Sequence, residues 1–381
     1  MSSEFPRADV DPGGLEEFSV VFTDRSLNSM SQAFQKVMRD LSAGLTEVYG
    51  ADEVVIVPGG GTFGMEAVAR QFGAGAHALI VRNGWFSYRW TQIFEASGIA
   101  RTTTVCKARQ VGNDSRSPFR PAPIEEVTAA IRAERPDLVF APHVETSAGM
   151  ILQDDYIAAM AAAAHEVGAL MVLDCIASGC VWVDMGETGV DVLLSAPQKG
   201  WSSTPCAGLV MLSDRAAARM AETTSSSFSM DLAKWRAIMA AYEEGGHAYH
   251  ATMPTDGLRA FRDALEETRA FGFDAAKAAQ IDLGRRVREM LAARGIRSIA
   301  ADGFAAPSVV VSYTDDPDVK SGKAFATTGT QVAAGVPLQV DEPADFQTFR
   351  IGLFGLDKLK DVDGTVGRLT AAVDRAMAKP G

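Results

Sequence analysis

A lysine and an aspartate in the middle of the chain are placed where they could act together. Asp174 ends the apolar run 169–173, and Lys199 follows the apolar run 190–195. Because parallel strands end at the same edge of a sheet, this pattern predicts an amine and a carboxylate at one edge. Pyridoxal 5'-phosphate (PLP) chemistry needs such a pair. The amine forms a Schiff base with the aldehyde, and the carboxylate keeps the pyridine nitrogen protonated.

A glycine-rich turn earlier in the chain is a candidate phosphate site. Residues 59–61 are three glycines between the apolar run 54–57 and the helical pattern 65–72, and Thr62 follows them. Glycines allow close backbone approach, and the next helix begins with free N–H groups and a partial positive charge. Such turns are also common packing devices, so this motif alone leaves phosphate binding and packing equally open.

Two other segments follow predicted strands, at the sheet edge where ligands bind in α/β proteins. Residues 83–90 include four aromatic side chains, and one such ring could stack on a planar cofactor. Residues 143–149 are polar, and Thr146 could hydrogen-bond a phenolate or phosphate oxygen. A packed core explains some of the aromatic residues, and a solvated loop is the alternative for the polar segment.

Two late segments add polar groups. Arg350 lies inside the apolar strand pattern 349–353 and therefore needs an anion. A substrate carboxylate suits its planar fork, and an internal Asp or Glu is the alternative that we favour less. The segment 247–254, with Tyr249 and Thr252, is polar and aromatic, and taken alone it fits any interdomain loop.

The order of apolar patterns predicts the architecture. Strand patterns and helical patterns alternate from about residue 54 to 212, which is typical of a mostly parallel central sheet flanked by helices. The strongly helical region 258–294 and the strand patterns 309–313 and 349–353 follow. We expect an α/β fold with an N-terminal arm (1–14), a large α/β domain (15–271) and a small C-terminal α+β domain (272–381).

Composition narrows the class of protein. The chain has 381 residues, 47% of them hydrophobic and 22% charged, as in ordinary globular proteins. A net charge of −12 argues against nucleic-acid and anionic membrane partners. The four cysteines lack metal-ligand spacing, so we expect no metal site and a reducing, cytoplasmic location. No apolar stretch reaches transmembrane length.

Together the motifs resemble the class V aminotransferases of PLP fold type I, in particular the alanine–glyoxylate and serine–pyruvate branch. The resemblance runs from about residue 30 to 355. It rests on an ordered set: Gly-Gly-Thr, Asn-Gly-aromatic-aromatic, Glu-Thr-Ser-x-Gly, Asp, Gln-Lys, Tyr-His-x-Thr and Arg-Ile-Gly. Relatives usually carry a Pro-Gly-Pro turn near the N-terminus, where this chain has residues 18–25. Trp201 after the Lys199 turn is a second departure, expected to narrow the substrate pocket.

The resemblance implies a role for each motif. Lys199 forms the internal aldimine and moves the substrate proton, and Asp174 pairs with the pyridinium nitrogen. Arg350 holds the α-carboxylate. Further cofactor contacts are implied as follows: Phe86 stacks on the ring, Thr146 bonds the phenolic oxygen, Gly61, Thr62 and Gln198 hold the phosphate, and Tyr249 and Thr252 reach the phosphate of the neighbouring subunit. A homodimer with shared active sites follows.

The expected reaction is ping-pong transfer of an amino group from a small L-amino acid, such as alanine or serine, to glyoxylate or pyruvate. A PLP-dependent lyase of the cysteine desulfurase type is the alternative. Gln198 stands where related desulfurases carry His, and no cysteine follows Cys206, so we favour the aminotransferase. A nucleotide-binding module without catalysis would leave Asp174 and Arg350 as coincidences.

Overall fold

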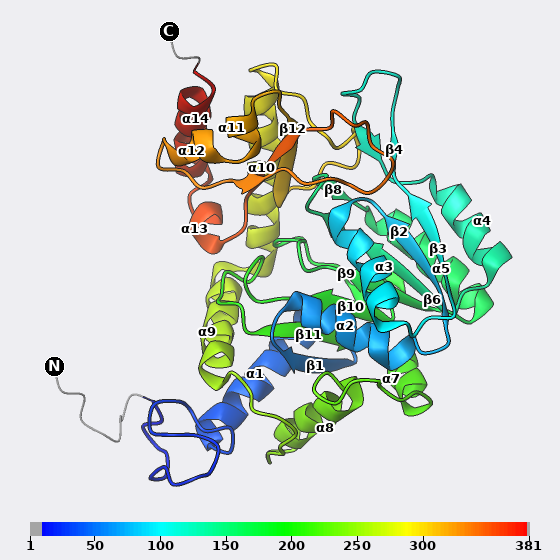
Figure 1. Ribbon diagram of the computed structural model, residues 1–381. Coiled ribbons are helices and arrows are strands. Elements are labelled where there is room, and N and C mark those ends of the chain that lie inside the picture. The colour runs from blue at the N-terminus through cyan, green and yellow to red at the C-terminus, as the bar shows by residue number, and fades with distance from the viewer. Residues whose placement is uncertain (1–9, 379–381) are drawn as a thin grey trace.

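A seven-stranded sheet is the centre of the computed structural model, which describes residues 10–378 (Figure 1). Its order is β1-β11-β10-β9-β6-β2-β3. The strands are β1 (Glu53–Pro58), β2 (His77–Arg82), β3 (Thr102–Lys107), β6 (Leu138–Pro142), β9 (Leu170–Asp174), β10 (Val192–Ser195) and β11 (Ala207–Leu212). β3, β2, β6, β9 and β10 are parallel, and β11 is antiparallel to both β10 and β1. The predicted mostly parallel sheet is confirmed.

Helices cover this sheet because its central strands are apolar along their whole length. Every residue of β2, β9, β10 and β11 is buried, which requires packing on both faces. The helices of this part are α1 (Gln32–Tyr49), α2 (Gly61–Phe72), α3 (Trp85–Ser97), α4 (Ile124–Glu134), α5 (Asp154–Val167), α6 (Met185–Thr188), α7 (Asp214–Ala221), α8 (Leu232–Glu243) and α9 (Thr255–Phe271). The sequence reading missed α3 and also β3, which begins with three threonines and is partly exposed at the edge.

Close glycine contacts bring the start of α2 onto the sheet. A Cβ on Gly208 in β11 would lie 2.7 Å from the Cα of Gly64 in α2, so Gly208 has no room for a side chain, and a Cβ on Gly64 would make a tight contact of 3.2 Å with the Gly208 Cα. At the start of the helix, a Cβ on Gly61 would lie 2.6 Å from the side chain of Ile176, two residues beyond β9. The glycines therefore place the N-terminus of α2 beside the carboxyl end of β9.

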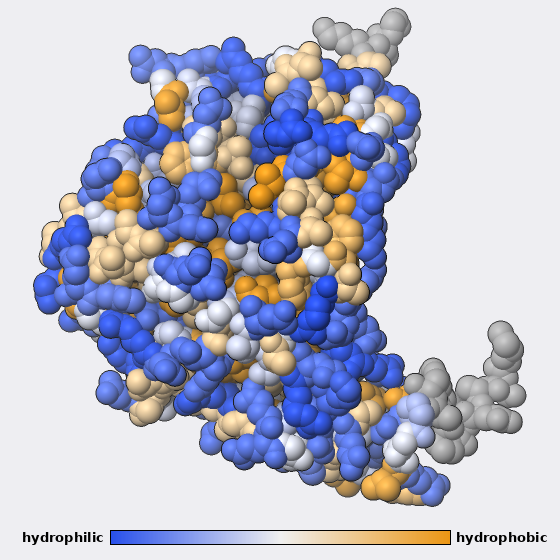
Figure 2. All heavy atoms as spheres, turned by 180° about the vertical axis from the view of Figure 1, so that it is seen from behind, coloured by the Kyte–Doolittle hydropathy of each residue, from blue (hydrophilic) through white to orange (hydrophobic). Residues whose placement is uncertain are grey.

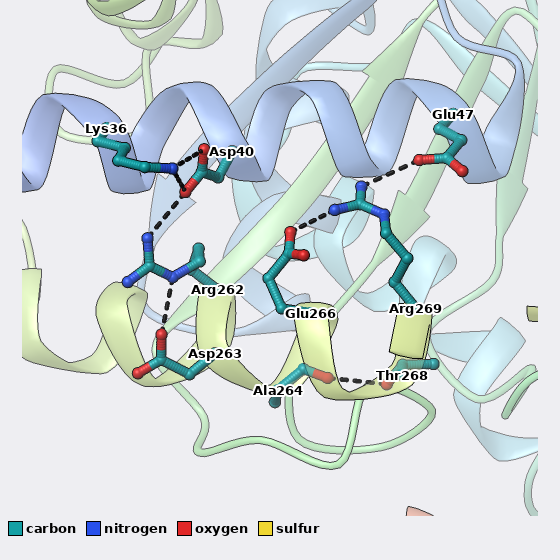
Figure 3. Close-up of polar contacts among 9 residues, drawn as sticks. All are labelled: Lys36, Asp40, Glu47, Arg262, Asp263, Ala264, Glu266, Thr268 and Arg269. Carbon is teal, nitrogen blue, oxygen red and sulfur yellow. Dashed lines mark hydrogen bonds and ion pairs between the residues drawn. The ribbon is translucent and has the colours of Figure 1, made fainter. Parts of the chain in front are cut away.

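The two long helices α1 and α9 lie side by side and are joined by ion pairs (Figure 3). Arg262 of α9 binds Asp40 of α1 at 2.8 Å, and Arg269 binds Glu47 at 3.0 Å. Ser31 caps α1 by accepting a hydrogen bond from the Phe34 N–H. This cap explains why the helix begins at Gln32.

The C-terminal part forms a second, smaller layer of structure. It holds α10 (Phe273–Ala292), α11 (Pro317–Lys320), α12 (Lys323–Ala326), α13 (Leu356–Leu359), α14 (Val362–Met377) and the antiparallel sheet of β12 (Val309–Tyr313), β14 (Thr348–Gly352) and β13 (Ala333–Ala334). The helical region expected at 258–294 is two helices, because Gly272 with a φ of 97° separates α9 from α10. Two short ribbons, β4 (Arg109–Gln110) with β5 (Phe119–Arg120) and β7 (Val144–Glu145) with β8 (Met150–Ile151), complete the fold.

The described core is not one continuous cluster. Buried apolar residues of α1, α9 and the main sheet form one cluster, and those of α10, β12, β14 and α14 form another. A third cluster joins residues of both parts, among them Val144 and Val311. Along the chain the first cluster reaches Leu265 and the second includes α10 from Ala276 onward, so we propose a domain boundary at 271/272. Of the expected arm, residues 1–9 lie outside the described residues, and residues 10–14 form a turn. No helix within 10–378 is long and apolar enough to cross a membrane.

Candidate active site

Asp174 and Lys199 lie at the same end of two neighbouring parallel strands, close enough for each to influence the pKa of the other. Asp174 is the last residue of β9 and lies beside Leu194 of β10 in the register. Lys199 follows β10 in a turn closed by the hydrogen bond from the Ser202 N–H to the Lys199 carbonyl at 3.0 Å. Ser202 has a φ of 60°, and its hydroxyl accepts the N–H of Leu356 at 2.8 Å. The Lys199 turn is therefore also tied to the C-terminal part.

Burial moves the pKa values of both members of this pair toward neutral pH. It raises the pKa of the Asp174 carboxyl to about 6, against the hydrogen bond that Asp174 accepts from the Ile176 N–H at 2.9 Å. Burial also lowers the pKa of the Lys199 amine, although the charge of Asp174 acts in the opposite direction. An aspartate in this place is stabilised when a cation such as a pyridinium faces it, so the pair fits PLP.

Glu145 lies beside the predicted site residues Phe86 and Thr146, although its residue type and spacing indicated no role for it. Its carboxylate is fully buried in β7 and accepts the backbone N–H groups of Phe86, Ser87 and Ser147, together with the hydroxyls of Ser87 and Ser147. A carboxylate at the N-terminus of α3 also faces the positive end of that helix. Glu145 therefore fixes the start of α3, which carries Phe86, against the strand that leads to Thr146.

Two arginines rest against the predicted stacking residue Phe86. The guanidinium carbon of Arg89 in α3 lies 5.3 Å from the ring centre, and that of Arg350 in β14 lies 5.5 Å from it. Neither arginine forms an ion pair within residues 10–378. Arg350 bonds instead to the carbonyl of Ala334 at 2.8 Å, so the internal Asp or Glu partner that we considered is not found among the described residues. The sequence reading missed Arg89, although its spacing of three from Phe86 was a helical signal.

The glycine turn and Gln198 present unsatisfied polar groups. Gly61 and Thr62 are the first two residues of α2, and the Gly60 cap supplies no side-chain hydrogen bond. Thr62 accepts a hydrogen bond from Arg89 Nη1 at 3.0 Å. The Gln198 Oε1 atom is buried and has no hydrogen-bond partner among the described residues. A bound phosphate would engage the free N–H groups of α2, so these residues fit the cofactor.

The predicted site residues do not all lie near one another within a single chain. Thr146 is buried beside Glu145, whereas Tyr249 is 62% exposed and bonds Thr252 at 3.3 Å on the segment between α8 and α9. No hydrogen bond within residues 10–378 joins this pair to Lys199. The expectation for Trp201 is corrected: its ring is fully buried and stacks on Trp182 at 4.6 Å, so it packs in the aromatic core and does not narrow an open pocket.

The fold and this site define the class of protein. The structure is similar to that of alanine–glyoxylate aminotransferase from Nostoc sp., with a TM-score of 0.76, 22% identity, and 91% of this chain and 88% of that chain covered. This fold is PLP fold type I, as the sequence predicted.

The family follows from the sequence comparison. The aminotransferase class-V profile matches residues 17–333, so the chain belongs to the class V aminotransferases and is a PLP-dependent aminotransferase. A 2-aminoethylphosphonate–pyruvate transaminase of Paraburkholderia phymatum is 27% identical over 354 residues, 90% of each chain. A protein named soluble hydrogenase, small subunit, of Synechococcus sp. is 26% identical over 346 residues, 90% of this chain and 86% of that one. The nucleotide-binding alternative is wrong.

Proposed function

We propose that the chain transfers the amino group of a small amino donor, such as L-alanine or L-serine, to pyruvate or glyoxylate. The observation that carries this proposal is the pairing of Asp174 and Lys199 at the ends of β9 and β10, with both pKa values moved toward neutral pH. The relative whose name includes pyruvate as a substrate supports that acceptor.

The side chains would divide the work by position. When bound, PLP supplies an aldehyde and a ring that delocalises electrons. Asp174 keeps a proton on the ring nitrogen, and Lys199, whose amine has a lowered pKa, takes the proton from the substrate Cα and returns it. Arg350 orients the α-carboxylate through a bidentate contact. Phe86 packs on the ring, Thr146 bonds its phenolic oxygen, and Gly61, Thr62 and Gln198 hold the phosphate.

The cysteines give the lyase alternative no support. A desulfurase needs a reactive thiolate, whereas burial raises the pKa of both Cys180 and Cys206 to about 12. Both thiols are free and buried, as is that of Cys175, and burial also raises the pKa of the partly buried Cys106 thiol. Free thiols are consistent with our proposal of a reducing, cytoplasmic setting.

Two identical subunits would complete each site. Tyr249 and Thr252 point their hydroxyls toward each other on an exposed segment, and exposed apolar side chains include Leu15, Phe18 and Val20 near the described N-terminus. We propose that these surfaces meet a second copy of the chain, and that Tyr249 and Thr252 reach the phosphate bound by that copy.

Replacement of Lys199 by alanine tests the proposed chemistry. Purified protein with PLP is expected to absorb in the violet, and Lys199→Ala to remove that band and lower kcat by at least about 100-fold. Lys320→Ala is the matched control, because this lysine ends the short helix α11 in the C-terminal part. A wild-type protein that stays colourless with added PLP would contradict the proposed site.

A further inference from the structure

Arg89 is a cation of the site without a role in the proposed reaction. It lies one helical turn after Phe86 on α3 and donates the hydrogen bond to Thr62 described above. Burial has the largest effect on the pKa of both Asp174 and Lys199. The positive charge of Arg89 has a smaller effect and lowers the pKa of the Asp174 carboxyl and of the Lys199 amine. A partly buried guanidinium without a carboxylate partner can be completed by an anion.

The proposed phosphate contacts are otherwise neutral. Gly61, Thr62 and Gln198 carry no charge, and the N-terminus of α2 contributes only about half a positive charge. A phosphate monoester carries about −1.5 to −2 at neutral pH. Moving such an anion out of water costs free energy unless cations and hydrogen bonds replace the water. Arg89 is the arginine that already contacts the start of α2, through Thr62.

We propose that Arg89 is a ligand of the PLP phosphate. This inference rests on the proposed function. It assigns the two arginines beside Phe86, which form no ion pair in the described part of the chain, to different anions. Arg89 comes from the large α/β part and reaches Thr62, so it serves the cofactor. Arg350 comes from β14 in the C-terminal part and bonds Ala334, so it is left for the substrate carboxylate.

The test compares PLP with pyridoxal, which has the same ring and aldehyde but no phosphate. Both dissociation constants are measured by absorbance and tryptophan fluorescence, without substrate. Arg89→Met is expected to weaken PLP binding roughly 10- to 100-fold, the usual range for a lost charged hydrogen bond. Its affinity for pyridoxal should stay close to that of the wild type. Arg89→Lys keeps the positive charge but loses the planar guanidinium, so its affinity for PLP should lie between those of the wild type and Arg89→Met.

Pyridoxal binding also serves as the folding control, because a collapsed site would lose both ligands. Arg109→Met is the matched surface control, since Arg109 pairs with Glu126 outside the site. If Arg89→Met binds PLP and pyridoxal in the wild-type ratio, the inference is wrong. If the variant instead raises only the KM of substrates with a second acidic group, Arg89 is a substrate residue and the inference is also wrong. A wild-type protein that binds no PLP would contradict the proposed function itself.

Discussion

At the scale of single residues, burial explains why Asp174 suits its role. An aspartate is rarely tolerated in a buried position, and this one receives one backbone hydrogen bond and faces the charge of Glu145, which raises its pKa further. Lys199 and Arg89 act in the opposite direction and do not overcome burial. The folded protein therefore carries a carboxyl group that is disfavoured in its charged form until a cation is bound beside it.

Stability against pH tests this conclusion in the PLP-free protein. The folded-state pKa of about 6 lies above the ordinary value of 3.8, so the folded protein binds more protons than the unfolded chain between these values. The stability contributed by this group is thus lost as pH rises from about 4 to about 6. Asp174→Asn cannot ionise, so its free energy of unfolding relative to wild type should rise by about 2–3 kcal/mol between pH 4 and pH 8.

Urea unfolding at the two pH values measures the difference. The control is Asp302→Asn on an exposed turn, which is expected to change stability by less than about 0.5 kcal/mol at either pH. If the free energy of unfolding of Asp174→Asn differs from that of the wild type by the same amount at pH 4 and pH 8, the raised pKa is contradicted.

At the scale of elements, the site is built from strand ends and helix starts that are locked together. Gly64 and Gly208 bring α2 onto β11, and the Glu145 carboxylate holds the start of α3. A side chain on Gly84 would meet Ser147 and Glu145, with its Cβ 2.1 Å from the Ser147 Oγ. The position of Phe86 and Arg89 on α3 thus depends on Glu145, a residue of the strand β7.

Glu145→Gln keeps the shape of this side chain but replaces one acceptor oxygen with a donor. All the groups that bond Glu145 are N–H or O–H groups, so buried donors would be left facing another donor. The free energy of unfolding is expected to fall by about 2–4 kcal/mol in denaturant titrations. Glu126→Gln makes the same change in an exposed ion pair with Arg109, which water screens, and should cost clearly less. Equal losses of unfolding free energy in the two variants would show that Glu145 does not hold the start of α3 in place.

At the scale of the whole molecule, two predicted site residues, Tyr249 and Thr252, lie away from the Lys199 site of the same chain. Tyr249 and Thr252 are exposed on the segment after α8, which Figure 1 shows at the opposite end of the molecule from the C-terminal layer. On the rear face, hydrophilic and apolar residues are interspersed (Figure 2). In the homodimer that we propose, a second copy of the chain would bring this segment to a site.

Hybrid dimers test the shared site. Lys199→Ala and the double variant Tyr249→Ala with Thr252→Ala should each have low activity at limiting PLP. When the two are co-expressed, half the dimers are hybrids in which one site has both defects and the other has neither. About a quarter of the wild-type activity is therefore expected to return. No gain above the sum of the separate variants would mean that Tyr249 and Thr252 do not act across an interface.

The sequence by itself determined the chemistry and much of the architecture. Lys199, Asp174 and the glycine turn are recognisable because each follows an apolar run of strand length, and the alternation of such runs predicts the parallel sheet. Local patterns are readable in this way because buried strands must be apolar along their length.

Tertiary structure alone decided which polar groups meet. Glu145 holds Phe86 across a gap of 59 residues, and Arg89 bonds Thr62 across 27. Trp201 reads as a residue of the pocket because it follows Lys199, yet its ring stacks on Trp182 in the core. Hydrogen bonds and packing between distant segments follow from the three-dimensional path of the chain, which residue types and spacing along one segment do not contain.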